Sequence, residues 1–120
     1  MSTSINKKNI QVIFKGVNIE GVKFVHFIKS TGRIELLDLF GIRDLKKIFI
    51  DVFCDDTAKI ALDELKEFED HGELIIIEPE VGKVSFLEVT FRFKSRSYKR
   101  DETRGLIWIR FITMIGPKRL

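Results

Sequence analysis

The alternation of hydrophobic and polar positions predicts a protein built mostly from β-strands. Residues 22–29 and 106–109 carry apolar side chains at both odd and even positions, which is typical of strands covered on both faces. Residues 46–54 are also predicted to form a strand, with Ile48, Ile50 and Val52 on one face and Phe49, Asp51 and Phe53 on the other. Residues 10–15, 73–78 and 105–115 are further strand candidates, bounded by turn-forming Gly, Asn or Pro. Because short turns connect successive strands, we expect antiparallel pairing.

Three other segments are less regular. Residues 34–40 are expected to form a short strand or an irregular segment, and residues 95–104, which are polar and basic, a loop or hairpin tip. Residues 83–94 read as one long strand in which the apolar positions change parity. A shift of one residue turns every side chain to the other face, so we predict a β-bulge near Phe86 and Leu87. The apolar residues at even positions are Val84 and Phe86, and those at odd positions are Leu87, Val89, Phe91 and Phe93.

One helix is predicted, over residues 57–70. Asp56 is expected to be its N-cap, and His71-Gly72 to end it. Its apolar residues recur at helical spacing and should face the core, namely Ala58, Ala61, Leu62, Leu65 and Phe68.

The order of these elements predicts the class α+β, as a mainly antiparallel β-barrel or sandwich of about seven strands with one flanking helix. We expect a flexible N-terminal arm over residues 1–9 and a single β-rich domain over residues 10–120.

The amino-acid composition excludes several classes of protein and of site. The chain has 120 residues, of which 44% are hydrophobic, enough for one core. Its single Cys excludes an intrachain disulfide and a Cys-rich zinc site. The polar N-terminus and the short apolar runs predict neither a secretory signal nor a membrane span, so we expect synthesis in a cytosol and no membrane partner.

The residues that could carry catalysis do not form a recognisable constellation. His26 is flanked by apolar residues and is expected in the core or an interface, whereas His71 is expected at the helix C-terminus. Cys54 precedes Asp55 and Asp56, whose charges would raise its thiol pKa, and helix capping accounts for the two carboxylates better than a metal does. Glycine spacing fits no phosphate loop. We therefore expect no enzyme activity, no cofactor and no metal.

Charge is divided along the chain. Residues 55–80 contain ten acids against two bases, and residues 83–110 contain eight bases against three acids. The two regions are either solvated surfaces or complementary surfaces in a head-to-tail contact between copies. The candidate interface residues are acidic Asp63, Glu67 and Asp70 and basic Arg92, Lys94, Arg96, Lys99, Arg100 and Arg104. Basic residues 92–104 could instead hold the phosphates of a nucleic acid.

The layout from Ile48 to Met114 resembles a family of phage proteins. A strand, an aspartate pair and an amphipathic helix precede a short strand, the turn Pro79-Glu-Val-Gly82 and two long strands separated by a polar loop. This order is similar to that of the N-terminal domain of phage DNA-circularisation proteins and of related tail-hub and distal-tail adaptors.

The resemblance implies a tail-tube-like fold whose copies form a ring around a central channel. It implies a structural subunit of a phage tail or phage-like contractile injection particle, at the hub or adaptor region between tube and baseplate. Its partners would be copies of itself and other tail or baseplate proteins, and its location the virion tail, after assembly in the host cytoplasm. Nucleic acid would be involved only by passage through the channel. The alternative is a nucleic-acid-binding β-barrel module that uses residues 92–104.

Overall fold

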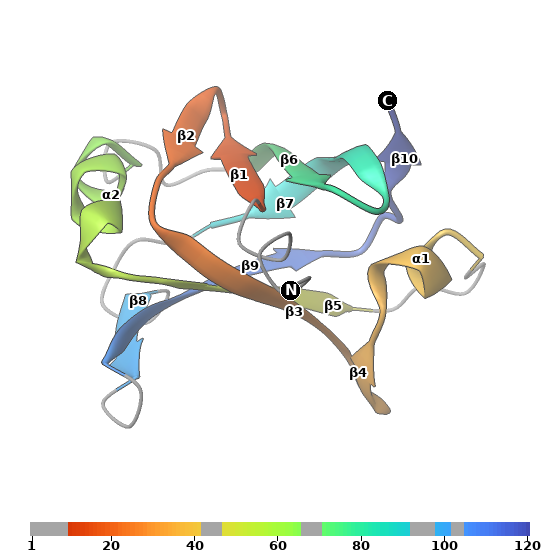
Figure 1. The fold of residues 1–120 in the computed structure, drawn as a ribbon. Coiled ribbons are helices and arrows are strands. Elements are labelled where there is room, and N and C mark those ends of the chain that lie inside the picture. Colours follow the sequence, from red (N-terminus) through yellow and green to blue (C-terminus); the bar gives the residue numbers. More distant parts are fainter. Residues whose placement is uncertain (1–9, 42–46, 66–70, 92–97, 102–104) are drawn as a thin grey trace, which may run out of the picture.

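The computed structural model shows ten strands within the part of the chain that it describes, which comprises residues 10–41, 47–65, 71–91, 98–101 and 105–120. For residues 98–101 we describe the backbone only. The strands are β1 (Gln11–Phe14), β2 (Val17–Ile19), β3 (Val22–Lys29), β4 (Gly32–Ile34), β5 (Ile48–Cys54), β6 (His71–Glu78), β7 (Gly82–Thr90), β8 (Tyr98–Asp101), β9 (Leu106–Thr113) and β10 (Lys118–Arg119). Figure 1 shows their arrangement.

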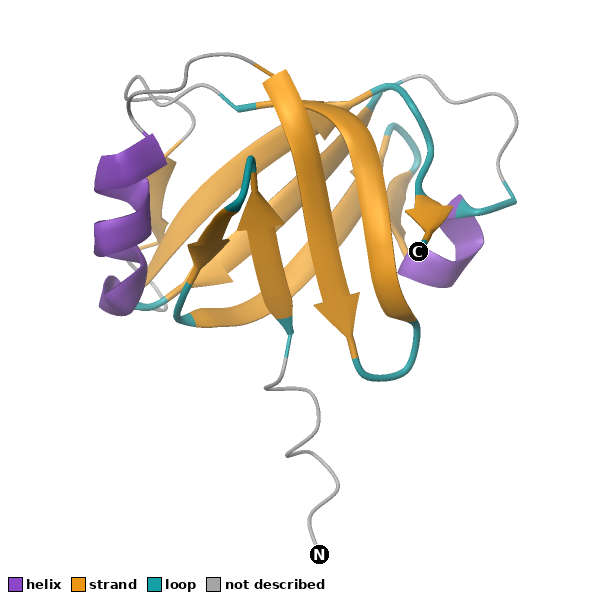
Figure 2. Ribbon diagram, turned by 90° about the horizontal axis from the view of Figure 1, so that it is seen from above, coloured by secondary structure: helices purple, strands orange, loops and turns teal. Residues whose placement is uncertain are grey.

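All strands belong to one antiparallel sheet. Its order is β2-β1-β6-β7-β9-β5-β3-β4, with β8 paired to β9 and β10 to β7. The sheet curls around a single core (Figure 2), but its ends do not pair with each other. The prediction of a mainly antiparallel β-structure with a flanking helix is confirmed. Closure into a barrel, one of the two predicted arrangements, is wrong because the sheet remains open, and the sheet has ten strands rather than about seven.

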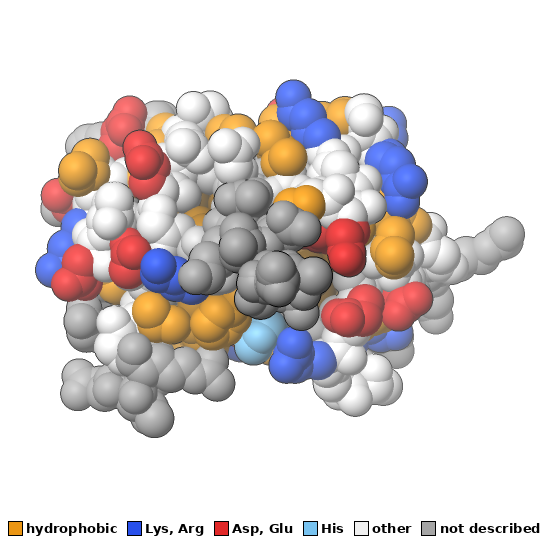
Figure 3. All heavy atoms as spheres, in the orientation of Figure 1, with side chains coloured by type: hydrophobic (Ala, Val, Ile, Leu, Met, Phe, Trp, Pro, Cys, Tyr) orange, Lys and Arg blue, Asp and Glu red, His pale blue; other side chains and the backbone are white. Residues whose placement is uncertain are grey.

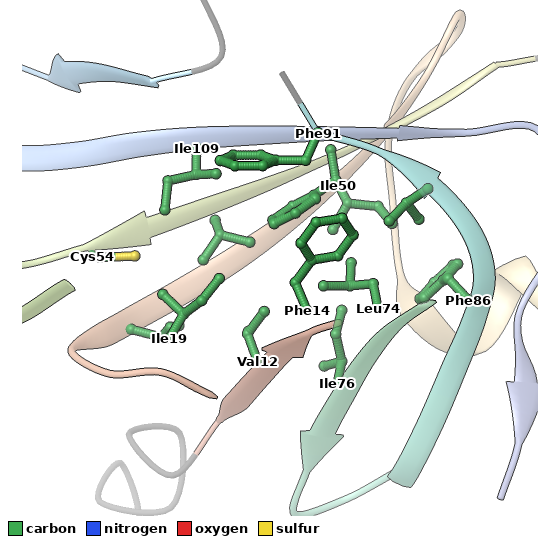
Figure 4. Close-up of a cluster of buried hydrophobic side chains, with 14 of the residues drawn as sticks. Val12, Phe14, Ile19, Ile50, Cys54, Leu74, Ile76, Phe86, Phe91 and Ile109 are labelled. Carbon is green, nitrogen blue, oxygen red and sulfur yellow. The ribbon is translucent and has the colours of Figure 1, made fainter. Parts of the chain in front are cut away.

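The core lies inside the curl of the sheet. Side chains of β9 alternate between buried and half-buried, and Ile107, Ile109 and Phe111 face inward. Phe14 and Phe91 pack against Phe111 with ring centroids 5.0 and 5.1 Å away. Figure 4 shows Phe14 and Phe91 together with inward residues of the neighbouring strands. Each large apolar side chain buried here stabilises the fold by about 1.5–3 kcal/mol.

The predicted β-bulge in β7 is confirmed. On β6, Gly72 and Leu74 are two positions apart, whereas their partners Val89 and Phe86 on β7 are three apart. The extra residue changes the parity, so Phe86 and Val89 are both fully buried while Leu87 between them is 45% exposed. The bulge therefore lets both halves of this long strand contribute to one core.

The flanking helix starts one residue earlier than predicted. Asp55, not Asp56, is the N-cap: its backbone is extended and its carboxylate accepts the Thr57 N–H at 2.9 Å. Asp56 is already in the first turn, η2 (Asp56–Ala58), which continues into α2 (Lys59–Leu65). Gly21 lies against this cap with φ +82°, and a Cβ there would come within 2.2 Å of the Asp55 carboxylate. Leu62 and Leu65 are buried, as predicted; Phe68 lies outside the described residues.

Three local predictions differ from the structure at least in part. His71 and Gly72, the predicted helix stop, belong to the start of β6 and pair with β7, and residues 66–70, over which the helix was expected to end, lie outside the described part of the chain. Residues 34–40 contain a single helical turn, α1 (Leu36–Leu39), because Leu36 and Leu39, three positions apart, are both buried. Residues 95–104, expected to be a loop or hairpin tip, include β8, which pairs with β9 and so forms one arm of a hairpin. No helix in the described ranges is both long and apolar enough to cross a membrane.

Candidate interaction surfaces

One face of the sheet points away from the core and carries a regular grid of side chains, which we call the outer face. Adjacent strands β3, β5 and β9 align their outward residues in three cross-strand rows. These rows are Phe24, Phe53 and Trp108; His26, Asp51 and Arg110; and Ile28, Phe49 and Ile112. The outer face therefore combines apolar rows on both sides with a polar row between them.

The polar row is centred on a bidentate ion pair. Arg110 donates from Nε and Nη2 to the two carboxylate oxygens of Asp51, at 2.7 and 2.9 Å. Asp51 is only 2% exposed, and Arg110 supplies the opposite charge that offsets the cost of burying this carboxylate. The guanidinium also lies 4.3 Å from the centroid of Phe49 and 5.0 Å from that of Trp108. Its hydrogen bond to Asp51 raises the pKa of Arg110 above its ordinary value, against the opposing effect of burial.

The aromatic side chains of the row Phe24, Phe53 and Trp108 pack against one another. The rings of Phe24 and Phe53 are stacked, with centroids 4.8 Å apart and an angle of 23° between their planes. His26 lies 4.9 Å from Phe24 and 5.4 Å from Phe53. Trp108 continues the row, with its centroid 6.1 Å from that of Phe53. Figure 3 shows hydrophobic side chains gathered beside a histidine, at the height where β3 crosses the molecule in Figure 1.

Only part of the outer face could be predicted from the sequence. Apolar residues at both parities indicated strands covered on both sides, and they identify β3, β5 and β9 correctly. His26 is half-buried on this face among aromatic rings and so does not lie in the core; its predicted interface position stays a prediction. The ion pair was not predicted, because Asp51 and Arg110 are far apart in the sequence and only strand register brings them together.

The predicted charged interface is described only in part. Asp63 is exposed on α2, as expected. Lys99 and Arg100 belong to β8, whose side chains we do not describe. The other predicted interface residues lie outside the described part of the chain, namely Glu67, Asp70, Arg92, Lys94, Arg96 and Arg104. The head-to-tail contact therefore stays a prediction.

The residues considered for catalysis or metal binding differ in burial and in their partners. Burial, reinforced by the neighbouring Asp55, raises the pKa of the Cys54 thiol to about 12. The pKa of Asp55 is lowered, mainly by its hydrogen bond with Thr57 and further by Lys23, whose Nζ lies 3.5 Å from the carboxylate. His71 is exposed, with Nε2 3.8 Å from a carboxylate oxygen of Glu88. Among the described residues, no group of three or more His, Cys, Asp or Glu could hold a metal ion.

A cavity of about 310 Å³ lies where the sheet fails to close; we call it the seam cavity. It is bounded by residues 23–27 of β3, residues 33–37 where β4 passes into α1, and residues 78–81 at the β6–β7 turn. Ile10 and Ile76 complete its apolar lining. This volume is at the lower end of the range for ligand sites in proteins.

The comparison with protein-family models gave no match, and no curated protein or solved structure matched the chain either. The resemblance to phage tail-hub and adaptor domains therefore stays a prediction, based on the order and spacing of the elements.

Proposed function

We propose that the protein is a structural subunit that assembles with copies of itself through the outer face. The observation that carries this proposal is the composition of the outer face: six of its nine residues are Phe, Trp or Ile. Aromatic residues with a central arginine are typical of the cores of protein interfaces. A neighbouring copy would cover these side chains and exclude water from the Asp51–Arg110 ion pair.

The resemblance gives this proposal its biological setting. The assembly would be a ring around a central channel, in the hub or adaptor region of a phage tail or phage-like contractile injection particle. The fold would then be a variant of the tail-tube type, in which an open antiparallel sheet with a flanking helix forms the protomer. Other tail or baseplate proteins would be the further partners, and the virion tail the location.

The outer face suits a protein partner better than a nucleic acid. Stacking platforms for single strands offer the free faces of aromatic rings to the bases. Phe24 and Phe53 are stacked on each other, so each has one face occupied. The buried carboxylate of Asp51 also places an acid at the centre of the grid. The nucleic-acid alternative is therefore supported by the basic residues 92–104 and by the pI of about 9.1, and not by the outer face.

Ile112→Lys tests the proposal, with Ile60→Lys as the matched control. Ile112 lies half-buried on the outer face, whereas Ile60 lies on α2 and is 78% exposed. We expect the wild type to form oligomers in size-exclusion chromatography with light scattering, and Ile112→Lys to shift toward the monomer. Ile60→Lys should behave as the wild type does. A wild type that stays monomeric at all concentrations, or equal assembly of both variants, would contradict the proposal.

A further inference from the structure

A second apolar patch lies on the other half of the sheet from the outer face. It consists of Ile13 of β1 and of Ile75 and Ile77 of β6, all half-buried, and we call it the isoleucine face. Their neighbours along the two strands, such as Val12 and Leu74, are fully buried in the core. Since successive side chains of a strand point to opposite faces, the three isoleucines point away from the core. Ile13 lies directly opposite Ile75, so their side chains adjoin.

The isoleucine face and the outer face point in opposite directions. The ring centroid of Phe14 on β1 lies 5.0 Å from that of Phe111 on β9, so these two strands face each other across the core. Ile13 and Ile112 are next to these phenylalanines in the sequence and therefore point out of the core on opposite sides. Figure 1 shows the same arrangement, with β1 and β6 above the core and β3, β5 and β9 below it. The protomer thus offers an apolar patch on each of two opposite sides.

The isoleucine face has a basic border. Ile77 lies opposite Lys83 of β7, and Ile75 lies opposite Ser85, which in turn pairs with Lys118 of β10. Both lysines are exposed, and within the described part of the chain neither makes an ion pair. Contact between two isoleucine faces would bring the lysines of two copies together, which is unfavourable. This surface is therefore suited to a different surface rather than to a copy of itself.

The outer face complements this basic border. Its acid and its base, Asp51 and Arg110, form an ion pair, so their charges cancel and the lysines would meet no unpaired like charge there. Aromatic rings attract cations, and the ring of Phe49 already lies 4.3 Å from the guanidinium of Arg110. Ile112, next to Phe49 in the same cross-strand row, offers an aliphatic surface to the isoleucines.

The size of the two faces favours a copy that uses both of them. Each face spans about three strands, roughly 4.8 Å apart, and about five residues along each strand, which corresponds to roughly 250 Å². A standard interface covers about 800 Å² on each partner. A single contact through either face is therefore weak, whereas a copy with a neighbour on both sides makes two such contacts. This favours a closed ring, in which every copy has two neighbours.

We propose that the isoleucine face receives the outer face of the next copy, so that the copies assemble head-to-tail. A contact between two outer faces would use the same surface twice and end at a dimer. Two different surfaces on opposite sides of the protomer let the contact repeat from copy to copy until a ring closes. The inference rests on the proposed function, because it names the surface that the outer face contacts.

The test mixes two variants that each lack one of the faces. Ile75→Lys places a charge in the isoleucine face, and Ile112→Lys places one in the outer face. Each variant alone should stay monomeric in size-exclusion chromatography with light scattering, because its copies share the same damaged surface. In an equimolar mixture, the intact outer face of one variant meets the intact isoleucine face of the other. We expect a 1:1 dimer of about 28 kDa, twice the 14.0 kDa of one chain, which forms at high protein concentration and grows no further.

The outcomes separate this inference from the proposed function. A wild type that stays monomeric contradicts the proposed function, and the head-to-tail contact with it. If the wild type assembles and Ile75→Lys assembles equally well, the outer faces contact each other and only the inference is wrong. The inference is also wrong if the mixture contains only monomers at concentrations well above those at which the wild type assembles.

Two further variants guard against trivial explanations. Far-ultraviolet circular dichroism checks that each variant is folded, and Ile13→Lys, directly opposite on β1, replaces Ile75→Lys if that variant does not fold. Ile60→Lys adds the same charge on α2, outside both faces, and should assemble as the wild type does. If Ile60→Lys also stays monomeric, the added charge acts from any position and the assignment of the two faces is wrong.

Discussion

The Asp51–Arg110 ion pair offers the sharpest test of how the outer face is stabilised. Replacing Arg110 with Met keeps a long side chain that can pack on Phe49 and Trp108, but removes both hydrogen bonds to Asp51. Asp51, which is 2% exposed in the wild type, then lacks its cation. We expect a clear loss of stability, because the buried carboxylate of Asp51 loses its cation while the packing is largely kept.

The expected loss of stability follows from how deeply Asp51 and Arg110 are each buried. Removing one partner of a fully buried ion pair costs about 3–5 kcal/mol. The Arg110 side chain is 33% exposed, so water can approach the vacated position and solvate part of the charge. We therefore expect Arg110→Met to lower the free energy of unfolding by about 2–3 kcal/mol. Adding Asp51→Val removes the stranded charge, and the double variant should lie within about 1 kcal/mol of the wild type.

Urea unfolding, followed by far-ultraviolet circular dichroism at several protein concentrations, measures these differences. Repeating the titration separates folding stability from any contribution of self-association. The control is Arg119→Met, since Arg119 is exposed and lies over the ring of Phe40, 5.1 Å from its centroid. Its change should be below about 1 kcal/mol. The reasoning is refuted if Arg110→Met matches this control, or if the double variant is as unstable as the single one.

Three further predictions address the helix and the charged surfaces. Leu65→Asp should cost about 4 kcal/mol or more in chemical unfolding because Leu65 is fully buried, whereas Ile60→Asp, at 78% exposure, should cost about 0.5 kcal/mol; similar losses in both would mean that the inward face is assigned wrongly. Asp55→Ala should cost about 1 kcal/mol at pH 7, with Asp55→Asn retaining most of the cap. The pKa of Asp55 is lowered in the folded state, so ionised Asp55 stabilises the fold at pH values above its ordinary pKa of 3.8. This stabilisation is lost as the pH falls through the pKa of the folded state. The melting temperatures of the wild type and of Asp55→Ala should therefore converge in acid. Reversal of Arg96 and Arg100 to Glu should leave the protomer folded but weaken assembly in light scattering, and unchanged assembly would argue against charge complementarity.

Long strands and the inward helix face could be predicted from the sequence, because each depends on local periodicity. β3 has the predicted bounds, and the parity change in β7 indicated a bulge that the register confirms. The inward face of α2 follows from the spacing of Leu62 and Leu65. Such patterns indicate which face of a strand or helix is buried, and they do not depend on which element packs against it.

The wrong predictions concern features that depend on distant parts of the chain. His71-Gly72 resembles a helix stop, but pairing with β7 makes it the start of a strand. Residues 34–40 are too short for helical periodicity to be evident, and the burial of Leu36 and Leu39 decides their conformation. Closure of the sheet depends on whether its end strands meet, which no local pattern records. The seam cavity follows from these last two features, and so could not be predicted.

The pairing of β1 with β6 has a consequence for the order of folding. Phe14 of β1 lies opposite Leu74 of β6, so the first hairpin cannot dock until some sixty further residues have emerged from the ribosome. The central strand β5 can pair with β3 as soon as it is made, but its other partner β9 begins only at Leu106. Non-local pairing of this kind slows folding into the millisecond-to-second range. During synthesis the strands before β6 and β9 therefore remain only partly covered until those two strands have been made, which makes chaperone protection most valuable at that stage.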